Sequence, residues 1–137
     1  MMTVFVCTDS RGGMLFGGRR ASYDMKIIED VIRYTGDGIL YISDFSEDLF
    51  SESEASVISV PDPLFSAGED AFVFVEDATL SPYIDKIDRL VIYNFGEAYP
   101  FDVRLDIDPK SAGFKLRSRR CFAGISHNNV TREDYIK

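Results

Sequence analysis

Five short runs of apolar residues constrain the fold more than any other feature of this sequence. Each run covers four or five positions and is rich in valine, isoleucine and phenylalanine. Such runs are typical of strands that are covered on both faces, as in a parallel sheet. The five predicted strands are Val4–Cys7, Ile39–Ile42, Val57–Val60, Ala71–Val75 and Leu90–Tyr93.

A helix is predicted between the first two strands. Residues 22–36 read "SYDMKIIEDVIRYTG", and the isoleucines and valine of this segment recur at helical spacing. Ser22 is expected to cap the helix, Asp24 to lie in its first turn and Gly36 to follow its last turn. The segment therefore predicts a strand–helix–strand unit.

The rest of the chain adds short helices and an antiparallel hairpin. Short helices are expected at Asp44–Phe50 and from near Thr79, while "GFKLRSRRCFAG" and "NVTREDYIK" read as strands at the edge of the sheet. We therefore predict one α/β domain over residues 1–137. Its three layers are a central, mixed but mostly parallel sheet and helices on both faces, with an antiparallel C-terminal hairpin.

The charge of the chain argues against several classes of partner. The net charge is −8, and residues 1–108 hold 21 acids against 8 lysines and arginines. This acidic surface should repel polyanions, so no nucleic-acid partner is expected. No apolar stretch is long enough for a signal peptide or a membrane span, so we expect a cytoplasmic protein without a membrane partner. The oligomeric state stays open.

Two further features have competing interpretations. Cys7 and Cys121 lie in apolar runs without CxxC spacing, which predicts buried free thiols rather than a redox pair or metal site. Residues 109–137 are basic, and Phe114 and Leu116 alternate with charged residues as in a half-buried strand. The basic residues fit an edge strand protected from aggregation, or else an interaction module that presents a basic hairpin.

The order of these elements resembles the dihydrofolate reductase family. A first strand ending at Asp9, the loop "GGMLFGGR" and a helix with an acid at its start match the beginning of that family. Its later segment reads roughly V-F-V-I-G-G-x-x-x-Y, then a short helix and a strand. Here Phe72–Val75, Tyr83 and Asp88–Ile92 match that pattern, and the resemblance covers roughly two thirds of the chain. It implies the reductase fold.

The resemblance also says where NADPH would bind, and the residues there differ. The family uses a glycine pair where this chain has Glu76 and Asp77, a G-R-x-T segment where it has "ISDFSED", and an Arg/Ser pair where it has "VPDPLF". Two carboxylates about 4 Å apart repel by about 4 kcal/mol at an effective dielectric constant near 20. A micromolar cofactor binds with only about 8 kcal/mol. We therefore expect no cofactor and no reductase activity, with a divergent reductase as the alternative.

Asp24 occupies the place where, by the resemblance, the family keeps the acid that pairs with the pteridine ring. The L-P-W that precedes this acid in the family is replaced by "RRAS". Small bacterial proteins with a similar "GGMLF" start and a "GxSH" near the end are sometimes labelled ribonuclease Z. That enzyme's paired zinc needs an H-x-H-x-D-H cluster, and His127 is the only histidine here, so the sequence does not support that activity.

The candidate ligand site is the segment "RRASYD". Arg19, Arg20, Ser22 and Asp24 precede a helix N-terminus, where free amides and the helix dipole favour an anion, and guanidinium groups strengthen that preference. The segment therefore predicts a small, anionic ligand. In the alternative interpretation the glycine pairs only make turns, and the arginines pair with the acidic surface.

Asp24 and His127 are the candidate catalytic residues. Histidine exchanges a proton near neutral pH, and the two side chains meet if the last hairpin folds over the first loop. In the alternative interpretation His127 is an ordinary turn residue. No metal site is predicted, although acids that follow strands suggest a Mg²⁺-dependent phosphate-ester hydrolase as a second enzyme class. These acids, which are also common turn residues, are Asp9, Asp44, Glu76 and Asp77.

Overall fold

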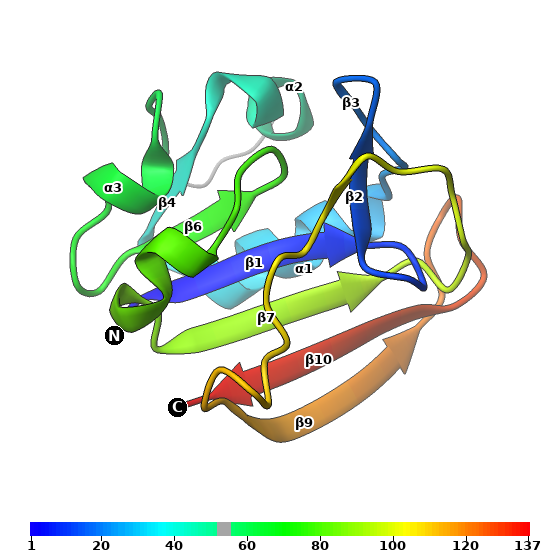
Figure 1. The fold of residues 1–137 in the computed structure, drawn as a ribbon. Coiled ribbons are helices and arrows are strands. Elements are labelled where there is room, and N and C mark those ends of the chain that lie inside the picture. Colours follow the sequence, from blue (N-terminus) through cyan, green and yellow to red (C-terminus); the bar gives the residue numbers. More distant parts are fainter. Residues whose placement is uncertain (52–55) are drawn as a thin grey trace.

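The computed structural model describes residues 1–51 and 56–137. The strands of its main sheet are β1 (Thr3–Thr8), β4 (Ile39–Ile42), β5 (Ser56–Ser59), β6 (Phe72–Val75), β7 (Arg89–Asn94), β9 (Lys115–Phe122) and β10 (Val130–Ile136). Within the described residues these seven strands lie in the order β5-β4-β6-β1-β7-β10-β9 (Figure 1). The first five are parallel, and β10 runs antiparallel to both β7 and β9. The five predicted strands and the mixed, mostly parallel sheet are confirmed.

The side chains of the central strands point alternately to the two faces of the sheet, so the core has two layers. In β1, Val4 and Val6 face one side of the sheet and Phe5 faces the other, and all three are fully buried. Successive side chains of a strand point to opposite faces, so a strand covered on both sides needs apolar residues at every position. This requirement explains the continuous apolar runs of the central strands. Strand β5 lies at the edge of the sheet and is mostly exposed, so its predicted cover on both faces is wrong.

Helix α1 (Met25–Thr35) covers one face of the sheet and lies behind it in Figure 1. Its buried residues Ile27, Ile28 and Val31 pack with Phe5. The short helices η1 (Asp44–Ser46, a 3₁₀ helix) and α2 (Glu47–Phe50) follow β4, and Leu49 and Phe50 join the same cluster. The predicted helices in both segments are therefore confirmed.

The N-cap of α1 differs from the prediction. Asp24, rather than Ser22, caps the helix, and its side chain accepts a hydrogen bond from the backbone N–H of Lys26 at 3.0 Å. Aspartate caps as well as serine does, and the helix begins only at Met25. Ser22 therefore lies outside the helix, where its hydroxyl is available for other contacts.

The opposite face is covered by shorter elements. Helix α3 (Pro63–Ser66), the 3₁₀ helix η2 (Ser81–Lys86) and residues 105–114 pack there against β1, β6 and β7. The predicted helix near Thr79 is thus a 3₁₀ helix. None of the helices in the described ranges has the length and apolarity that crossing a bilayer requires.

The glycine-rich loop forms a small second sheet that the sequence did not predict. Within the described residues this sheet has three strands, in the order β3 (Arg19–Arg20), β2 (Gly13–Phe16), β8 (Val103–Arg104). Gly17 and Gly18 connect β2 to β3 with φ of 59° and 76°. This region of φ is costly for residues with a Cβ, so the interpretation of these glycines as turn residues is confirmed.

The C-terminal hairpin is antiparallel, as predicted, but its outer strand is more exposed than expected. Strand β9 is an edge strand, and Leu116 is 42% exposed. Cys121 is also exposed, so its predicted burial is wrong, while Cys7 is partly buried and both thiols are free. Among the described residues Phe122, at the end of β9, is the one residue of this strand that packs against a core cluster, and the other residues of β9 are exposed.

Candidate functional site

The C-terminal hairpin folds onto the start of α1 and brings Asp24 and His127 into contact. The His127 Nδ1 atom lies 3.0 Å from the Asp24 Oδ2 atom, and both side chains are buried. The two residues are 103 positions apart. The condition that the sequence left open, that the hairpin approaches the first loop, is therefore met.

Both carboxylate oxygens of Asp24 are occupied by the protein's own donors. Oδ1 accepts from the backbone N–H groups of Lys26 and Ile125, both at 3.0 Å. Oδ2 accepts from the backbone N–H groups of Ser126 at 2.8 Å and His127 at 3.1 Å, as well as facing the imidazole. Because these contacts saturate the carboxylate, Asp24 can act on a ligand only through His127.

This environment keeps Asp24 ionised. Burial alone would raise the pKa of Asp24, but the amide of Ile125, the His127 side chain and the amides of Lys26 and Ser126 together lower that pKa from 3.8 to about 2. A carboxylate with several N–H donors is stabilised in its charged form. The N-cap position of α1 therefore carries a fixed negative charge.

The other ring nitrogen of His127 faces two hydroxyl groups. Its Nε2 atom lies 2.9 Å from the Ser22 Oγ atom and 3.2 Å from the Tyr99 hydroxyl oxygen. The Phe95 ring stacks on the imidazole with centroids 4.7 Å apart. These contacts fix the ring plane, so Ser22, His127 and Asp24 form one continuous hydrogen-bonded chain.

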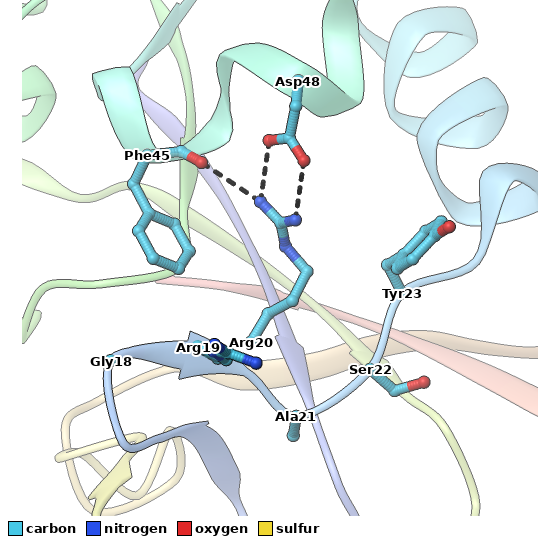
Figure 2. A pocket seen from close by; sticks show the side chains of 8 residues that line it. All are labelled: Gly18, Arg19, Arg20, Ala21, Ser22, Tyr23, Phe45 and Asp48. Carbon is cyan, nitrogen blue, oxygen red and sulfur yellow. Dashed lines mark hydrogen bonds and ion pairs between the residues drawn. The ribbon is translucent and has the colours of Figure 1, made fainter.

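A pocket of about 590 Å³, which Ser22 helps to line, opens beside these hydrogen-bonded residues (Figure 2). Arg19 is exposed in it, and among the described residues its side chain makes no hydrogen bond or ion pair. In Figure 2 the Ser22 side chain points away from the Arg20 guanidinium. The pocket is lined by Gly18, Arg19, Arg20, Ala21, Ser22, Tyr23, Phe45 and Asp48.

Arg20 is held by two carboxylates. Its Nη1 and Nη2 atoms contact both Asp48 oxygens at 2.8 and 3.0 Å, and its Nε atom donates to the buried Glu76 at 2.7 Å. Burial would lower the pKa of Arg20, but Glu76 and Asp48 raise it well above its ordinary value. Arg20 therefore ties β3 to α2 and to the end of β6, and Arg19 is the cation left open to the pocket.

The acids that follow the strands are also engaged with their own chain. Asp9 accepts backbone hydrogen bonds from Arg11 and Gly13 at 2.8 Å and from Tyr99 at 2.9 Å. Asp44 accepts from the Ser59 hydroxyl and Asp77 from the Ser43 hydroxyl. Among the described residues no group of three His, Cys, Asp or Glu side chains is arranged to hold a metal ion.

Several residues of the site carried no recognisable signal in the sequence. Tyr99 and Phe95 lie in a loop after β7, and Gly124 lies where a Cβ atom would stand 2.8 Å from Asp24 Cγ. Their roles depend on contacts between segments far apart in the sequence. A glycine three residues before the only histidine, in "GISH", was the one available hint.

The ionisation of Asp24 predicts how stability depends on pH. The folded-state pKa of about 2 lies below the ordinary 3.8, so this stabilisation is complete above about pH 4 and is lost as the pH falls toward 2. The shift corresponds to about 2 kcal/mol. We expect the difference in unfolding free energy between the wild type and Asp24→Asn to shrink by that amount between pH 5 and pH 2, measured by urea titration. A difference independent of pH would contradict the proposed anchoring of the carboxylate.

Comparison with known proteins supports the fold but assigns no family. The chain is similar to a dihydrofolate reductase from Enterococcus faecalis, solved in complex with NADP(H) and RAB-propyl. The TM-score is 0.70 at 10% identity, and the alignment covers 99% of this chain and 95% of that one. No protein-family model and no curated protein sequence matches the chain significantly. The dihydrofolate reductase-like fold is therefore confirmed, and an identity this low shows the fold alone.

Proposed function

We propose that this chain is a single-domain, divergent dihydrofolate reductase-like protein of the cytoplasm that binds a small anionic ligand beside the first loop. The proposed site consists of Arg19, Arg20, Ser22 and the Asp24–His127 pair. It needs no cofactor and no metal ion. The ligand belongs in the pocket of about 590 Å³, a volume suited to a small molecule.

The observation that carries the proposal is the environment of Arg19. Its guanidinium is exposed at the pocket and, within residues 1–51 and 56–137, pairs with no acid. Arg20, its neighbour, already pairs with Glu76 and with Asp48, the one acid that lines the pocket. An anion entering the pocket therefore meets an open guanidinium, which forms strong, charge-assisted hydrogen bonds to carboxylate or phosphate.

The aromatic residues of the pocket support a ligand with an apolar or planar part. The Phe45 ring stacks on the Arg20 guanidinium, whose carbon lies 5.1 Å from the ring centroid, and Tyr23 is 52% exposed. Exposed aromatic faces beside a cation offer both apolar area and orientation to a bound ring. The proposed ligand combines one negative group with such a body.

The residues at the end of β6 support the expectation that this protein does not bind NADPH as the reductases do. Glu76 is buried, ion-paired with Arg20 and bonded to the Ser46 hydroxyl at 2.7 Å. A pyrophosphate at this place would have to displace the Arg20 pair or accept a carboxylate as its neighbour. These residues do not fit the cofactor, and no step of the proposed function uses it.

The test is a thermal-shift screen of the wild type with inorganic phosphate, dicarboxylates, nucleotides, folates, NADPH and Mg²⁺. A ligand at 100 times its dissociation constant adds about 2.7 kcal/mol of stability. We expect at least one small anion to raise Tm, and Arg19→Gln to weaken that binding by about tenfold, the equivalent of about 1.4 kcal/mol. Arg119→Gln, which removes the same charge from the exposed strand β9, is the matched control and should bind as the wild type does.

Three results would overturn the proposal. A shift with NADPH that exceeds the shift with every other anion would favour the divergent reductase. Equal weakening by Arg19→Gln and Arg119→Gln would mean that the ligand responds to overall charge rather than to the pocket. A shift with Mg²⁺ alone would favour the hydrolase that uses the acids after the strands.

A further inference from the structure

We propose that Ser22 is a nucleophile, activated by His127 and Asp24, and that the site hydrolyses small carboxylic esters. The inference is based on the hydrogen bonds that join these three side chains. Ser22 Oγ lies 2.9 Å from His127 Nε2, and His127 Nδ1 lies 3.0 Å from Asp24 Oδ2. A hydroxyl, an imidazole and a buried carboxylate joined in this order and through these two nitrogens form the arrangement that activates serine in unrelated hydrolase folds.

The positions of the protons follow from the neighbours of His127. The ionised Asp24 can only accept hydrogen bonds, so the Nδ1 atom of His127 carries a proton. In the neutral imidazole Nε2 is then the unprotonated nitrogen, and it faces the Ser22 hydroxyl. This is the tautomer that a general base for Ser22 requires.

Tyr99 fits the next stage of proton transfer. Its hydroxyl donates its one proton to Glu97 at 2.9 Å, and its oxygen lies 3.2 Å from His127 Nε2. Burial and the bond to Glu97 raise the pKa of Tyr99, which keeps that proton in place. Once His127 has taken the Ser22 proton, Nε2–H can donate to the Tyr99 oxygen, and Asp24 balances the imidazolium charge.

Backbone donors lie next to the proposed nucleophile. The N–H groups of Ser22 and Tyr23 donate no hydrogen bond to any acceptor in the part of the chain that the structure describes. Both precede α1, and Ser22 lines the pocket and is only partly buried. Amides in this position can stabilise the oxygen that becomes negative when a carbonyl is attacked.

The reaction balances with water as the second reactant. Ser22 Oγ bonds to the ester carbonyl carbon while its proton moves to His127 Nε2. The bond from that carbon to the alkoxy oxygen breaks, and the leaving alcohol takes the proton from His127. Water then attacks the acyl-serine, gives its proton to His127 and releases the acid, and Ser22 recovers the proton.

The expected negative charge of the ester rests on the proposed function, in which Arg19 binds an anion. The expected reactivity of Ser22 does not depend on it. Arg19 lies three residues before Ser22, and both residues line the pocket. An ester with a carboxylate at its far end can place that group at Arg19 and its carbonyl beside Ser22. We therefore expect a preference for negatively charged esters over neutral ones.

The first experiment uses diisopropyl fluorophosphate, an uncharged probe that bonds to activated serines with loss of fluoride. We expect one label per chain, mapped to Ser22 by mass spectrometry of the wild type. Since general-base catalysis typically contributes about 10²- to 10⁴-fold, His127→Gln should slow labelling by about 100-fold. Ser111→Ala is the matched control, because Ser111 is an exposed serine bonded directly to a carboxylate, Asp108, at 2.9 Å, and the variant should label as the wild type does.

The second experiment compares p-nitrophenyl acetate with the mono-p-nitrophenyl ester of succinate. We expect a higher kcat/KM for the succinate ester, loss of that preference in Arg19→Gln and loss of both activities in Ser22→Ala. Ser22 is only partly buried, so removing its hydroxyl should leave the circular dichroism spectrum unchanged. Absence of label on Ser22, or labelling that His127→Gln does not slow, would overturn the nucleophile. Labelling of Ser22 without any preference for the charged ester would overturn the anionic substrate and the proposed role of Arg19, but not the nucleophile.

Discussion

Replacing Arg20 with methionine is expected to lower the unfolding free energy by about 3 kcal/mol, because removing one partner of a buried ion pair leaves the other charge unpaired. The uncompensated group is Glu76, whose side chain is only 7% exposed. Asp48 is 64% exposed and can return to water at little cost. Urea titration at pH 7 measures the loss.

The neighbouring arginine provides the matched control for this prediction. Arg19→Met makes the same change one position earlier in β3, on a side chain that is exposed, and should alter stability by no more than about 0.5 kcal/mol. The double variant Arg20→Met, Glu76→Met removes the stranded charge as well and should recover part of the loss. Equal effects of the two single arginine variants would contradict the role of Arg20 as a clamp.

The sheet and α1 could be predicted because their signals are local. The run Val4–Cys7 is apolar at every position, which only a strand covered on both faces requires, and the residues of α1 repeat at helical spacing. The small second sheet was missed because β2 pairs with β8, a two-residue strand close to ninety residues further along the chain. Strand β9 was expected to be half-buried because alternation in a sequence reports a two-faced strand without telling whether a layer covers either face.

The candidate site was predictable only in part, for a similar reason. Asp24 and His127 were selected by residue type and by their places beside the helix start and in the last turn. Their contact depended on where the hairpin folds, which no local pattern encodes. The link to Ser22 was missed because its expected role as N-cap was filled by Asp24. Because Asp24 caps the helix, the Ser22 hydroxyl is free to face His127 Nε2. Placing the start of α1 two residues too early in the sequence prediction therefore concealed this contact.

The structure also separates the two arginines that the sequence treated as equivalent. Both were predicted to bind an anion, with pairing to acidic residues as the alternative. Arg20 makes the acid pairs of the alternative interpretation, while Arg19 is open to the pocket. Glu76 therefore has a structural reason to stand where the reductase resemblance expects glycine: through Arg20 it anchors β3, the strand that holds Arg19 and ends two residues before Ser22.

Replacing Gly124 with alanine is expected to lower the unfolding free energy by about 3 kcal/mol and to disconnect His127 from α1. The added Cβ would overlap Asp24 Oδ2 and stand 2.8 Å from Asp24 Cγ. Asp24 cannot move aside without losing its bonds to Ile125, Ser126 and His127, since all three donors belong to the same loop as Gly124. Overpacking costs about 1–3 kcal/mol, and each buried donor left unpaired costs a further 1–3 kcal/mol or so.

Gly68→Ala is the matched control for this last prediction. Gly68, like Gly124, has no positive φ, but a Cβ there would meet no atom within 4 Å, so its stability should change by less than about 0.5 kcal/mol. In Gly124→Ala the proton NMR signal of His127 Nδ1–H should be lost, because the displaced carboxylate no longer shields that proton from exchange with water. Retention of this signal together with wild-type stability would contradict the close packing of Gly124 against Asp24 from which this loss is predicted.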